Sequence, residues 1–207
     1  MDKIFSFLAQ GGLVMIPLGI CSFLALAIII EKFIILRKRK LINPEIISVI
    51  KNLTQPEDIS LALNVTNSYK ASLSRLVKII LENAHQPLED IKEDVADQSR
   101  QEIHALERGL ALLETVAAIA PILGLLGTVL GMIKVFSMIS LQGVGDAASL
   151  SGGISEALIS TAFGLSIGIP TLVFYNYFLR KSQDIILDLE NICNDLLRKI
   201  RKFKMES

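Results

Sequence analysis

The stretch TVAAIAPILGLLGTVLGMI, residues 115–133, contains no charged side chain. Two further stretches share this property, residues 4–30 and residues 157–179. A helix of about 20 apolar residues crosses the ~30 Å hydrocarbon core of a bilayer, so each stretch is long enough to span a membrane. The sequence therefore predicts an all-α membrane protein with three transmembrane helices, extended by long helices into a cytoplasmic helical domain.

The composition argues against several classes of soluble protein. The mean hydropathy is +0.52 and 20% of the residues are charged, which is more apolar than a soluble domain requires. The 21 Lys and Arg residues balance the 21 Asp and Glu residues, whereas a nucleic-acid-binding protein carries a basic surplus. We therefore expect neither a soluble enzyme nor a nucleic-acid-binding protein.

Motifs for catalysis and cofactor binding are also missing from the sequence. It has no Gly-rich phosphate loop followed by Lys and no nucleophile elbow. His85 and His104 lack a Cys or a second His at metal-ligand spacing. Cys21 lies in the first span and Cys193 in the cytoplasmic tail, so we expect no disulfide between them. The sequence therefore predicts no enzymatic activity, no metal and no cofactor.

Basic residues near the ends of the three apolar stretches predict the orientation of the chain. They follow the first stretch at residues 37–40, precede the second at Arg108 and follow the third at residues 180–181. The N-terminal leader has only Lys3, and residues 141–155 have no basic residue. Because Lys and Arg concentrate on the cytoplasmic side of membrane proteins, we expect the N-terminus outside and the C-terminus in the cytoplasm.

The first stretch reads as a retained anchor, because it runs into a basic segment without a signal-peptide cleavage site. The chain is then predicted to divide into a periplasmic N-terminal leader 1–12, a transmembrane helix 13–36, a cytoplasmic helical loop 37–110, a transmembrane helix 111–138, a periplasmic turn 139–154, a transmembrane helix 155–179 and a cytoplasmic C-terminal helix 180–207.

Several helices are predicted in the cytoplasmic loop. Pro44 and Pro56 are expected to begin short helices, with Thr54 as a possible cap of the second. An apolar stripe predicts a third helix over residues 68–84. Pro87 begins a further helix, which we expect to continue without a break into the second span over about 50 residues.

The C-terminal tail carries a helical seam of apolar residues spaced three or four apart: Ile185, Leu189, Ile192, Leu196, Ile200 and Phe203. The spacing predicts that the third span continues as a helix to about Lys204. The seam packs either on the chain's own loop helices or on neighbouring subunits. The basic residues around Lys199 are interpreted as a solvated helix end, with anionic lipid or nucleic acid as alternatives.

Small residues recur within the second and third stretches at spacings that let helix backbones approach closely in lipid. The second stretch contributes Gly124, Gly127 and Gly131. The third contributes Gly164 and Gly168, followed by Pro170. These residues are expected to pack the membrane helices together.

Polar residues in the spans are the candidate functional residues. Glu156 and Ser160 fall on one stripe of the third span, and Thr161 is turned about 140° from that stripe at 100° per residue. Thr128 stands among the glycines of the second span. Such groups mark an ion path; the alternatives are that Glu156 lies at the outer interface and that each Thr bonds to a carbonyl one turn back. Lys134 is expected to extend to the outer interface.

Two runs of sequence carry a family resemblance. The run APILGLLGTVLGM at residues 120–132 resembles the second-span signature of the MotA/TolQ/ExbB proton-channel family. The run GISEALISTAFGL at residues 153–165, with Ile169-Pro170 and Tyr175-Asn176, resembles its third-span signature. The three spans, their orientation and the long loop are similar to the ExbB/TolQ branch, because MotA-type members have four spans.

The resemblance implies a homopentameric ring in the bacterial inner membrane, with spans two and three lining a central pore. It implies that Thr128 and Thr161 face this pore and that Glu156 is the glutamate at the head of span three; Ser160 is grouped with them. It also implies a single-span ExbD/TolR-like partner with an intramembrane Asp. The sequence itself has no carboxylate at mid-depth in a span, so a proton path requires an acid from another chain.

The implied function is the conversion of the proton motive force into mechanical work for an envelope or outer-membrane transport system, with a TonB/TolA-like protein as a further partner. Two other readings stay open: a passive scaffold or mechanosensitive channel in which Glu156 sets cation preference, and a small-solute transporter. Dependence on a single-span partner distinguishes the scaffold from a proton-driven motor. A transporter is disfavoured because transporters usually show internal repeats and broken mid-span helices, and only Pro170 interrupts a span here. Whether the chain belongs to an ExbB, TolQ or motility system does not follow from the sequence.

Overall fold

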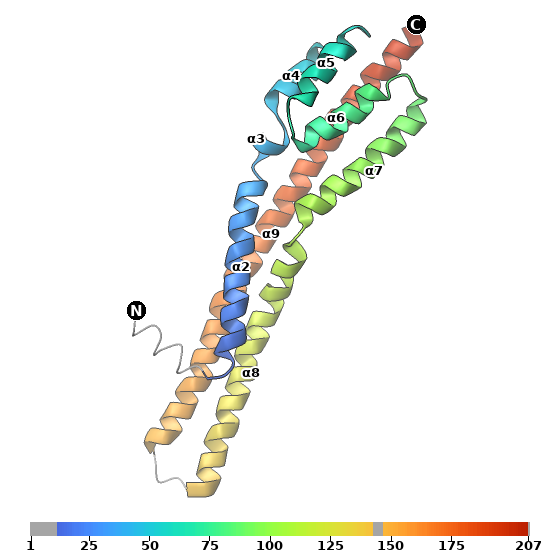
Figure 1. Cartoon of the computed structure of the whole chain (residues 1–207). Helices are drawn as coiled ribbons and strands as arrows, with labels where there is room; N and C mark the ends of the chain where they lie inside the picture. Colours follow the sequence, from blue (N-terminus) through green and yellow to red (C-terminus); the bar gives the residue numbers. More distant parts are fainter. Residues whose placement is uncertain (1–11, 143–146, 207) are drawn as a thin grey trace. The chain divides into compact units, whose positions relative to one another are not determined.

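The computed structural model describes residues 12–142 and 147–206, and within these ranges every regular element is an α-helix (Figure 1). The helices are α2 (Met15–Ile35), α3 (Lys38–Leu41), α4 (Pro44–Asn52), α5 (Asp58–Asn67), α6 (Ser72–Glu82), α7 (Leu88–Glu107), α8 (Leu110–Gln142) and α9 (Ala147–Glu206). The expected N-terminal leader and the expected turn fall largely or partly on residues 1–11 and 143–146, which lie outside the described residues.

Three helical segments of the described chain are long and apolar enough to cross a membrane. They lie within Met15–Ile35, Leu88–Ser140 and Leu150–Met205. The predicted number of three spans is confirmed, and the all-α class is confirmed for the described residues.

The chain divides into two compact helical units. The first unit comprises Met1–Glu31 and Gly109–Tyr177, and the second comprises Lys32–Arg108 and Phe178–Ser207. Helices α2 and α9 contribute residues to both units. The three uncharged stretches fall almost entirely in the first unit, and most of the charged residues fall in the second.

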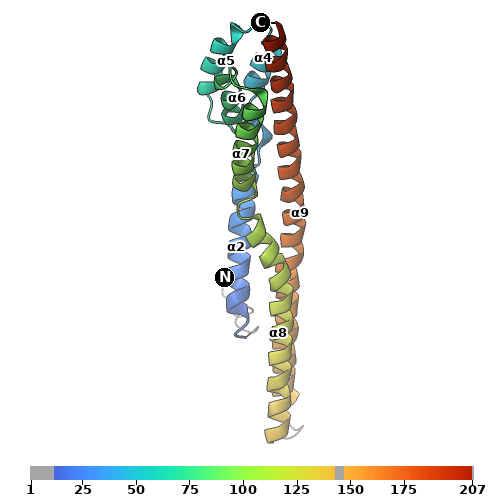
Figure 2. The same ribbon diagram turned by 90° about the vertical axis from the view of Figure 1, so that its right-hand side faces the viewer.

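Within the first unit, α8 lies alongside the N-terminal half of α9, as both views show (Figures 1 and 2). Their backbones approach closely at Gly164: a Cβ atom there would lie 2.6 Å from the carbonyl oxygen of Ala120 and 2.9 Å from the Cα of Gly124. A larger side chain at this position would force the helices apart. Small residues therefore set the distance between α8 and α9, as packing in lipid requires.

Prolines occur inside both long helices without ending them. Pro121 lies within α8 and Pro170 within α9. A Cβ atom on Gly168 would lie 2.5 Å from the Cγ of Pro121, so the glycine gives the proline ring its space. Neighbouring helices in a membrane bundle accommodate prolines that would break an exposed helix in water.

In the second unit, α4 packs on α5, α5 on α6 and α6 on α7. Helix α4 begins at Pro44 as predicted, and Asn43 caps it by accepting a hydrogen bond from the backbone N–H of Glu45 at 3.0 Å. Proline suits this position because the first N–H groups of a helix have no partner within it.

The expected cap at Thr54 is wrong. The residue before α5 is Glu57, and the capping interaction runs the other way: Asp58 Oδ2 accepts the backbone N–H groups of Gln55 at 3.0 Å and Thr54 at 3.1 Å. These two bonds lower the pKa of Asp58. The Asp58 side chain, in the first turn of α5, therefore stabilises the turn that precedes the helix. It takes the place of a capping side chain before the helix.

The expected continuous helix from Pro87 into the second span is also wrong. Helix α7 ends at Glu107 and α8 begins at Leu110, with Gly109 at φ +85°. Glycine adopts this left-handed conformation at no steric cost, which makes it the usual residue just past a helix end. The last turn of α7 is also stabilised by Lys32, whose Nζ donates to the carbonyl oxygen of Leu106 at 2.7 Å although the lysine is only 1% exposed.

Two expectations for the loop and tail are refined. The third loop helix is shorter than predicted, running from Ser72 to Glu82, and the tail helix continues to Glu206. The apolar seam of the tail is buried or half-buried within the second unit itself, which favours packing on the chain's own helices. Lys199 does not belong to a solvated helix end as expected. Its Nζ donates to three carbonyl oxygens at the end of α4: Ile50, Lys51 and Leu53.

Candidate functional site

The centre of the candidate site is a pair of threonine hydroxyl groups between α8 and α9. Thr128 Oγ1 and Thr161 Oγ1 are hydrogen-bonded to each other, and both side chains are half-buried. Thr161 Oγ1 also lies 3.1 Å from the carbonyl oxygen of Gly124, and Thr128 Oγ1 lies 3.2 Å from that of Ala157. Each hydroxyl group thus has the other hydroxyl and a carbonyl oxygen across the interface within reach.

This geometry allows two directions of hydrogen bonding. A hydroxyl group has one proton to donate and two lone pairs to accept with. Thr128 can donate to Thr161, which then donates to the Gly124 carbonyl, or Thr161 can donate to Thr128, which then donates to the Ala157 carbonyl. Both arrangements keep every donor satisfied, so the pair can reverse its polarity without moving the backbone.

The bond to a carbonyl one turn back, expected as the alternative to a functional role, describes only part of what is observed. Thr128 Oγ1 does lie 3.4 Å from Gly124 O in its own helix. Its shorter carbonyl contact, however, is to Ala157 in the other helix, and Thr161 bonds to the carbonyl of Gly124 rather than to one in its own helix. The threonines therefore connect the two helices instead of satisfying one.

Ser160 lies in the same helix contact but in a different environment. Its side chain is fully buried, and its hydroxyl donates to the carbonyl oxygen of Glu156, one turn back, at 2.9 Å. A Cβ atom on Gly127 would lie 2.4 Å from that of Ser160, so the serine fills the space that the glycine leaves. Gly131 has the same relation to Ala157, at 2.8 Å.

Glu156, which begins the polar stripe of α9, forms an ion pair across the interface. Its Oε2 lies 2.8 Å from Nζ of Lys134 on α8, with 23% of the glutamate side chain and 54% of the lysine side chain exposed. Lys134 was expected at the outer interface, without a partner. The signal that finds the pair is the antiparallel register: Gly131 faces Ala157, so Glu156, one position before Ala157, meets Lys134, about one turn after Gly131.

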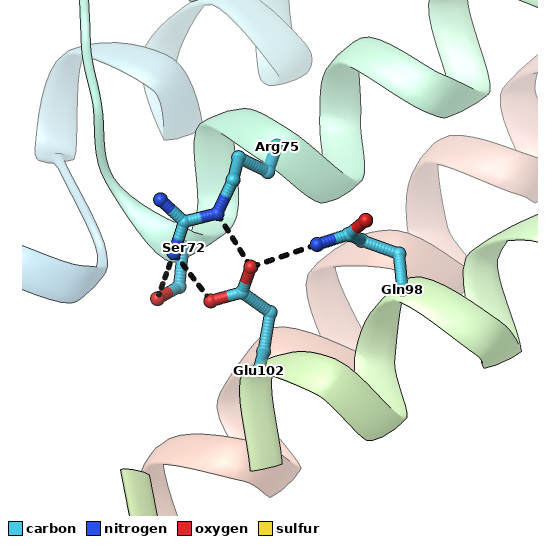
Figure 3. Close-up of polar contacts among 4 residues, drawn as sticks. All are labelled: Ser72, Arg75, Gln98 and Glu102. Atoms are coloured by element: carbon cyan, nitrogen blue, oxygen red, sulfur yellow. Dashed lines mark hydrogen bonds and ion pairs between the residues drawn. The ribbon is translucent and has the colours of Figure 1, made fainter. Parts of the chain in front are cut away.

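A second polar cluster lies in the other unit, where Arg75 on α6 and Glu102 on α7 form a two-pronged ion pair (Figure 3). Arg75 Nε lies 2.5 Å from Glu102 Oε1 and Nη2 lies 2.6 Å from Oε2, and Gln98 donates to Oε1 at 3.0 Å. Burial alone would raise the pKa of Glu102, but hydrogen bonds from Arg75, Ser72 and Gln98 outweigh it and lower that pKa. The cluster joins two helices and holds no arrangement suited to catalysis.

Metal ligation finds no support in the described ranges, where no group of three or more His, Cys, Asp and Glu side chains is placed to hold an ion. Cys21 and Cys193 are both free thiols. Burial raises the pKa of Cys193 to about 12, with the nearby Glu190 carboxylate adding to the effect.

Comparison with known proteins identifies the family. The model of the MotA/TolQ/ExbB proton channel family matches residues 64–191, more than half of the chain. The chain belongs to this family. Both signature runs, and with them the threonine pair and the Lys134–Glu156 pair, lie inside the matched range.

Individual relatives support the ExbB/TolQ branch, as the signatures predicted. The chain is 35% identical to biopolymer transport protein ExbB-like 3 of Synechocystis over 175 residues, which are 81% of either chain. It is 40% identical to biopolymer transport protein ExbB of Aquifex aeolicus over 87 residues, and 46% identical to that of Helicobacter pylori over 77 residues. These two alignments cover 42% and 37% of this chain and 59% and 53% of the relatives.

Membership of this family, with three apolar helices, makes the chain a multi-pass membrane protein of a proton-channel family. The family is one of ion-conducting transport components and not of enzymes.

Proposed function

We propose that the chain is the ring-forming subunit of a proton-driven motor in the bacterial inner membrane. Five copies form a ring whose second and third spans line a pore, with N-termini in the periplasm and C-termini in the cytoplasm. A single-span ExbD/TolR-like partner carries an Asp into the pore. The complex converts the proton motive force into mechanical work on an envelope or outer-membrane transport system, through a TonB/TolA-like protein.

The observation that carries this proposal is the reversible hydroxyl pair of Thr128 and Thr161. A carboxyl group that alternates between charged and neutral needs partners that donate to the charged form and accept from the neutral form. A hydroxyl group does both without holding charge itself. The pair therefore suits transient contact with a partner Asp whose protonation state changes, and Glu156 and Ser160 lie within the next turn and a half of α9.

An acid from another chain is required for the path. Residues 115–133 and 157–179 contain no Asp, Glu, Lys or Arg, and the Glu156 carboxylate forms an ion pair with Lys134. A proton taken up by the partner Asp neutralises it, which lets the carboxylic acid cross an apolar region that the carboxylate cannot cross cheaply. Release beside a threonine of another subunit restores the charge.

The energetics favour a cyclic mechanism. A charge moving through 100 mV yields about 2.3 kcal/mol. This is too little for large mechanical work in one step, so the motor accumulates work over repeated proton transfers that turn the partner inside the ring.

The test is a comparison of three threonine variants in cells that express the chain with its partner. Thr161→Val removes the hydroxyl group at nearly constant size and is expected to abolish proton-driven transport, whereas Thr161→Ser retains it. Thr115→Val is the matched control, because the Thr115 hydroxyl is exposed and donates to Ala111 one turn back at 2.8 Å. Full transport activity of Thr161→Val would contradict the role of the pair.

Omitting the partner separates the motor from a passive scaffold or channel. A motor subunit conducts and transports nothing without the Asp-bearing chain. If the purified ring alone conducts ions at the rate of the full complex, the channel reading is correct and the motor proposal fails.

A further inference from the structure

Lys134 and Glu156 are isolated from all other charges along their helices. They are the only charged residues in 115–142 and in 147–179, and residues 4–30 of the first apolar stretch carry none. The nearest charge on α8 in the other direction is Glu114, about 30 Å away at 1.5 Å per residue. The two charges of the ion pair therefore cancel within these ranges, and the next charge in the sequence is Asp146, between them.

Each carboxylate oxygen of Glu156 has a neighbour. Oε2 accepts the Lys134 ammonium group at 2.8 Å. Oε1 faces the backbone of Gly12, where an added Cβ atom would lie only 2.1 Å away and where φ is +73°. The left-handed backbone conformation favours glycine at this position, and a Cβ atom there would displace the carboxylate. The Glu156 carboxylate thus lies between Gly12, just before α2, and the Lys134 side chain of α8.

A carboxylate without such partners would attract metal cations. Alkali and alkaline-earth cations bind carboxylate oxygens, and a group of one sign in a cleft with low-dielectric walls concentrates counterions. The Lys134 ammonium group occupies the position that a Na⁺ ion would take on Oε2.

We propose that Lys134 is a specificity-determining residue, which excludes Na⁺ from the ion path by occupying the carboxylate of Glu156. Hydroxyl groups carry protons without offering a negative charge to a metal ion, and the partner Asp is negatively charged only between the release of one proton and the uptake of the next. The inference rests on the proposed function for its effect on transport, but not for its effect on Na⁺ binding.

The experiment measures proton flux into liposomes that contain the full chain with its single-span partner. A membrane potential drives the flux, a pH-sensitive dye reports it, and Na⁺ replaces N-methylglucamine outside at constant ionic strength. We expect wild type and Lys134→Arg to be insensitive to Na⁺. In Lys134→Gln we expect Na⁺ to inhibit, with a half-inhibiting concentration at least about tenfold below the highest Na⁺ concentration that leaves wild type unaffected, the lower end of such counterion enrichment.

Two controls separate specificity from structure. Lys92→Gln removes a lysine of similar exposure that also lies 2.8 Å from a glutamate, Glu89, but outside the spans, and should respond as wild type does. The double variant Lys134→Gln/Glu156→Gln lacks the unpaired carboxylate and should lose the Na⁺ sensitivity again. A merely structural role of Lys134 would predict the double variant to be no less impaired than the single one.

A second measurement keeps the inference testable whatever the flux shows. Broadening of the ²³Na magnetic resonance line reports Na⁺ binding to the purified chain in nanodiscs without partner or transport. We expect more broadening by Lys134→Gln than by wild type or the double variant. Equal broadening by wild type and Lys134→Gln would overturn the inference, while absent proton flux in wild type would overturn the proposed function alone. If Lys134→Gln does not assemble, the swapped pair Lys134→Glu/Glu156→Lys replaces it, and Na⁺ sensitivity of that variant would overturn the inference.

Discussion

Thr128 and Thr161, 33 positions apart in the chain, share a hydrogen bond between their hydroxyl groups at the contact of α8 and α9. Each hydroxyl also reaches a carbonyl oxygen of the opposite helix, Ala157 for Thr128 and Gly124 for Thr161. The two side chains therefore act as a unit, and substitutions at either position are expected to depend on the other.

Substituting both threonines should cost less than the sum of the two single substitutions. Thr128→Val and Thr161→Val each leave the remaining hydroxyl with a carbonyl partner but without its hydroxyl partner, at about 1 kcal/mol each. Because the double variant loses the shared bond only once, we expect a coupling free energy of about 0.5–1 kcal/mol. Thermal unfolding of the four proteins in detergent, followed by circular dichroism, measures this term, and strict additivity would contradict the direct bond.

Enlarging Gly164 should separate the helices, whereas enlarging Gly19 should not. A Cβ atom on Gly164 meets backbone atoms at 2.6 to 3.0 Å, but one on Gly19 in α2 meets nothing within 4 Å. Overpacking of this kind costs about 1–3 kcal/mol, so Gly164→Ala is expected to lower the unfolding temperature and impair assembly. Gly19→Ala, the matched control, should behave as wild type or slightly better, since alanine favours helix. Equal stability of the two variants would show that the contact can relax.

Stability should fall in acid because of Glu102. Its pKa in the folded protein lies below the ordinary value of 4.5, so the ion pair with Arg75 contributes fully above pH 4.5 and is lost as pH falls through the folded pKa. Glu102→Gln should lower the free energy of unfolding at pH 7 by about 1–3 kcal/mol and flatten its decline below pH 4.5. Asp97→Asn, in an exposed pair with Arg100, is the control and should change neither.

A parallel acid decline in wild type and Glu102→Gln would assign the pH dependence to other carboxylates. The measurement is the unfolding midpoint by circular dichroism between pH 3 and pH 7, since the chain has no Trp for fluorescence.

Cys193 should resist alkylation while the protein is folded. Its pKa rises from 9.0 to about 12, which lowers the thiolate fraction at pH 8 by about 1,000-fold, and its side chain is buried. We expect N-ethylmaleimide to label Cys193 in a Cys21→Ser background only after unfolding in dodecyl sulfate, as measured by mass spectrometry. Labelling of the folded protein within minutes would show that the tail helix leaves its neighbours.

The membrane spans and the family were predictable from the sequence because each depends on local composition. A charged side chain is expensive in hydrocarbon, so the uncharged stretches mark the spans without any knowledge of their neighbours. Pro44 likewise predicted the start of α4 because proline restricts its own backbone. The run of glycines and threonines at residues 120–132 indicated the family in the same local way.

The break between α7 and α8 was not predictable by the same means. Leu106, Leu110 and Leu113 are all buried, so the apolar pattern continues through a point where the helix ends. The end depends on the left-handed conformation of Gly109 and on Lys32, a residue 74 positions from the carbonyl group to which it donates. A periodicity records which residues are buried, but not whether the backbone hydrogen bonds between them are intact.

The sequence by itself determined that this chain crosses a membrane three times, carries no acid at mid-depth in its spans and resembles a family of proton channels. Tertiary structure alone decided which polar groups meet: Thr128 with Thr161, Lys134 with Glu156, and Arg75 with Glu102. The physical reason is range. Hydrophobic transfer acts on each segment separately, whereas hydrogen bonds and ion pairs require two atoms from distant positions within about 3 Å, a distance that only the packed helices set.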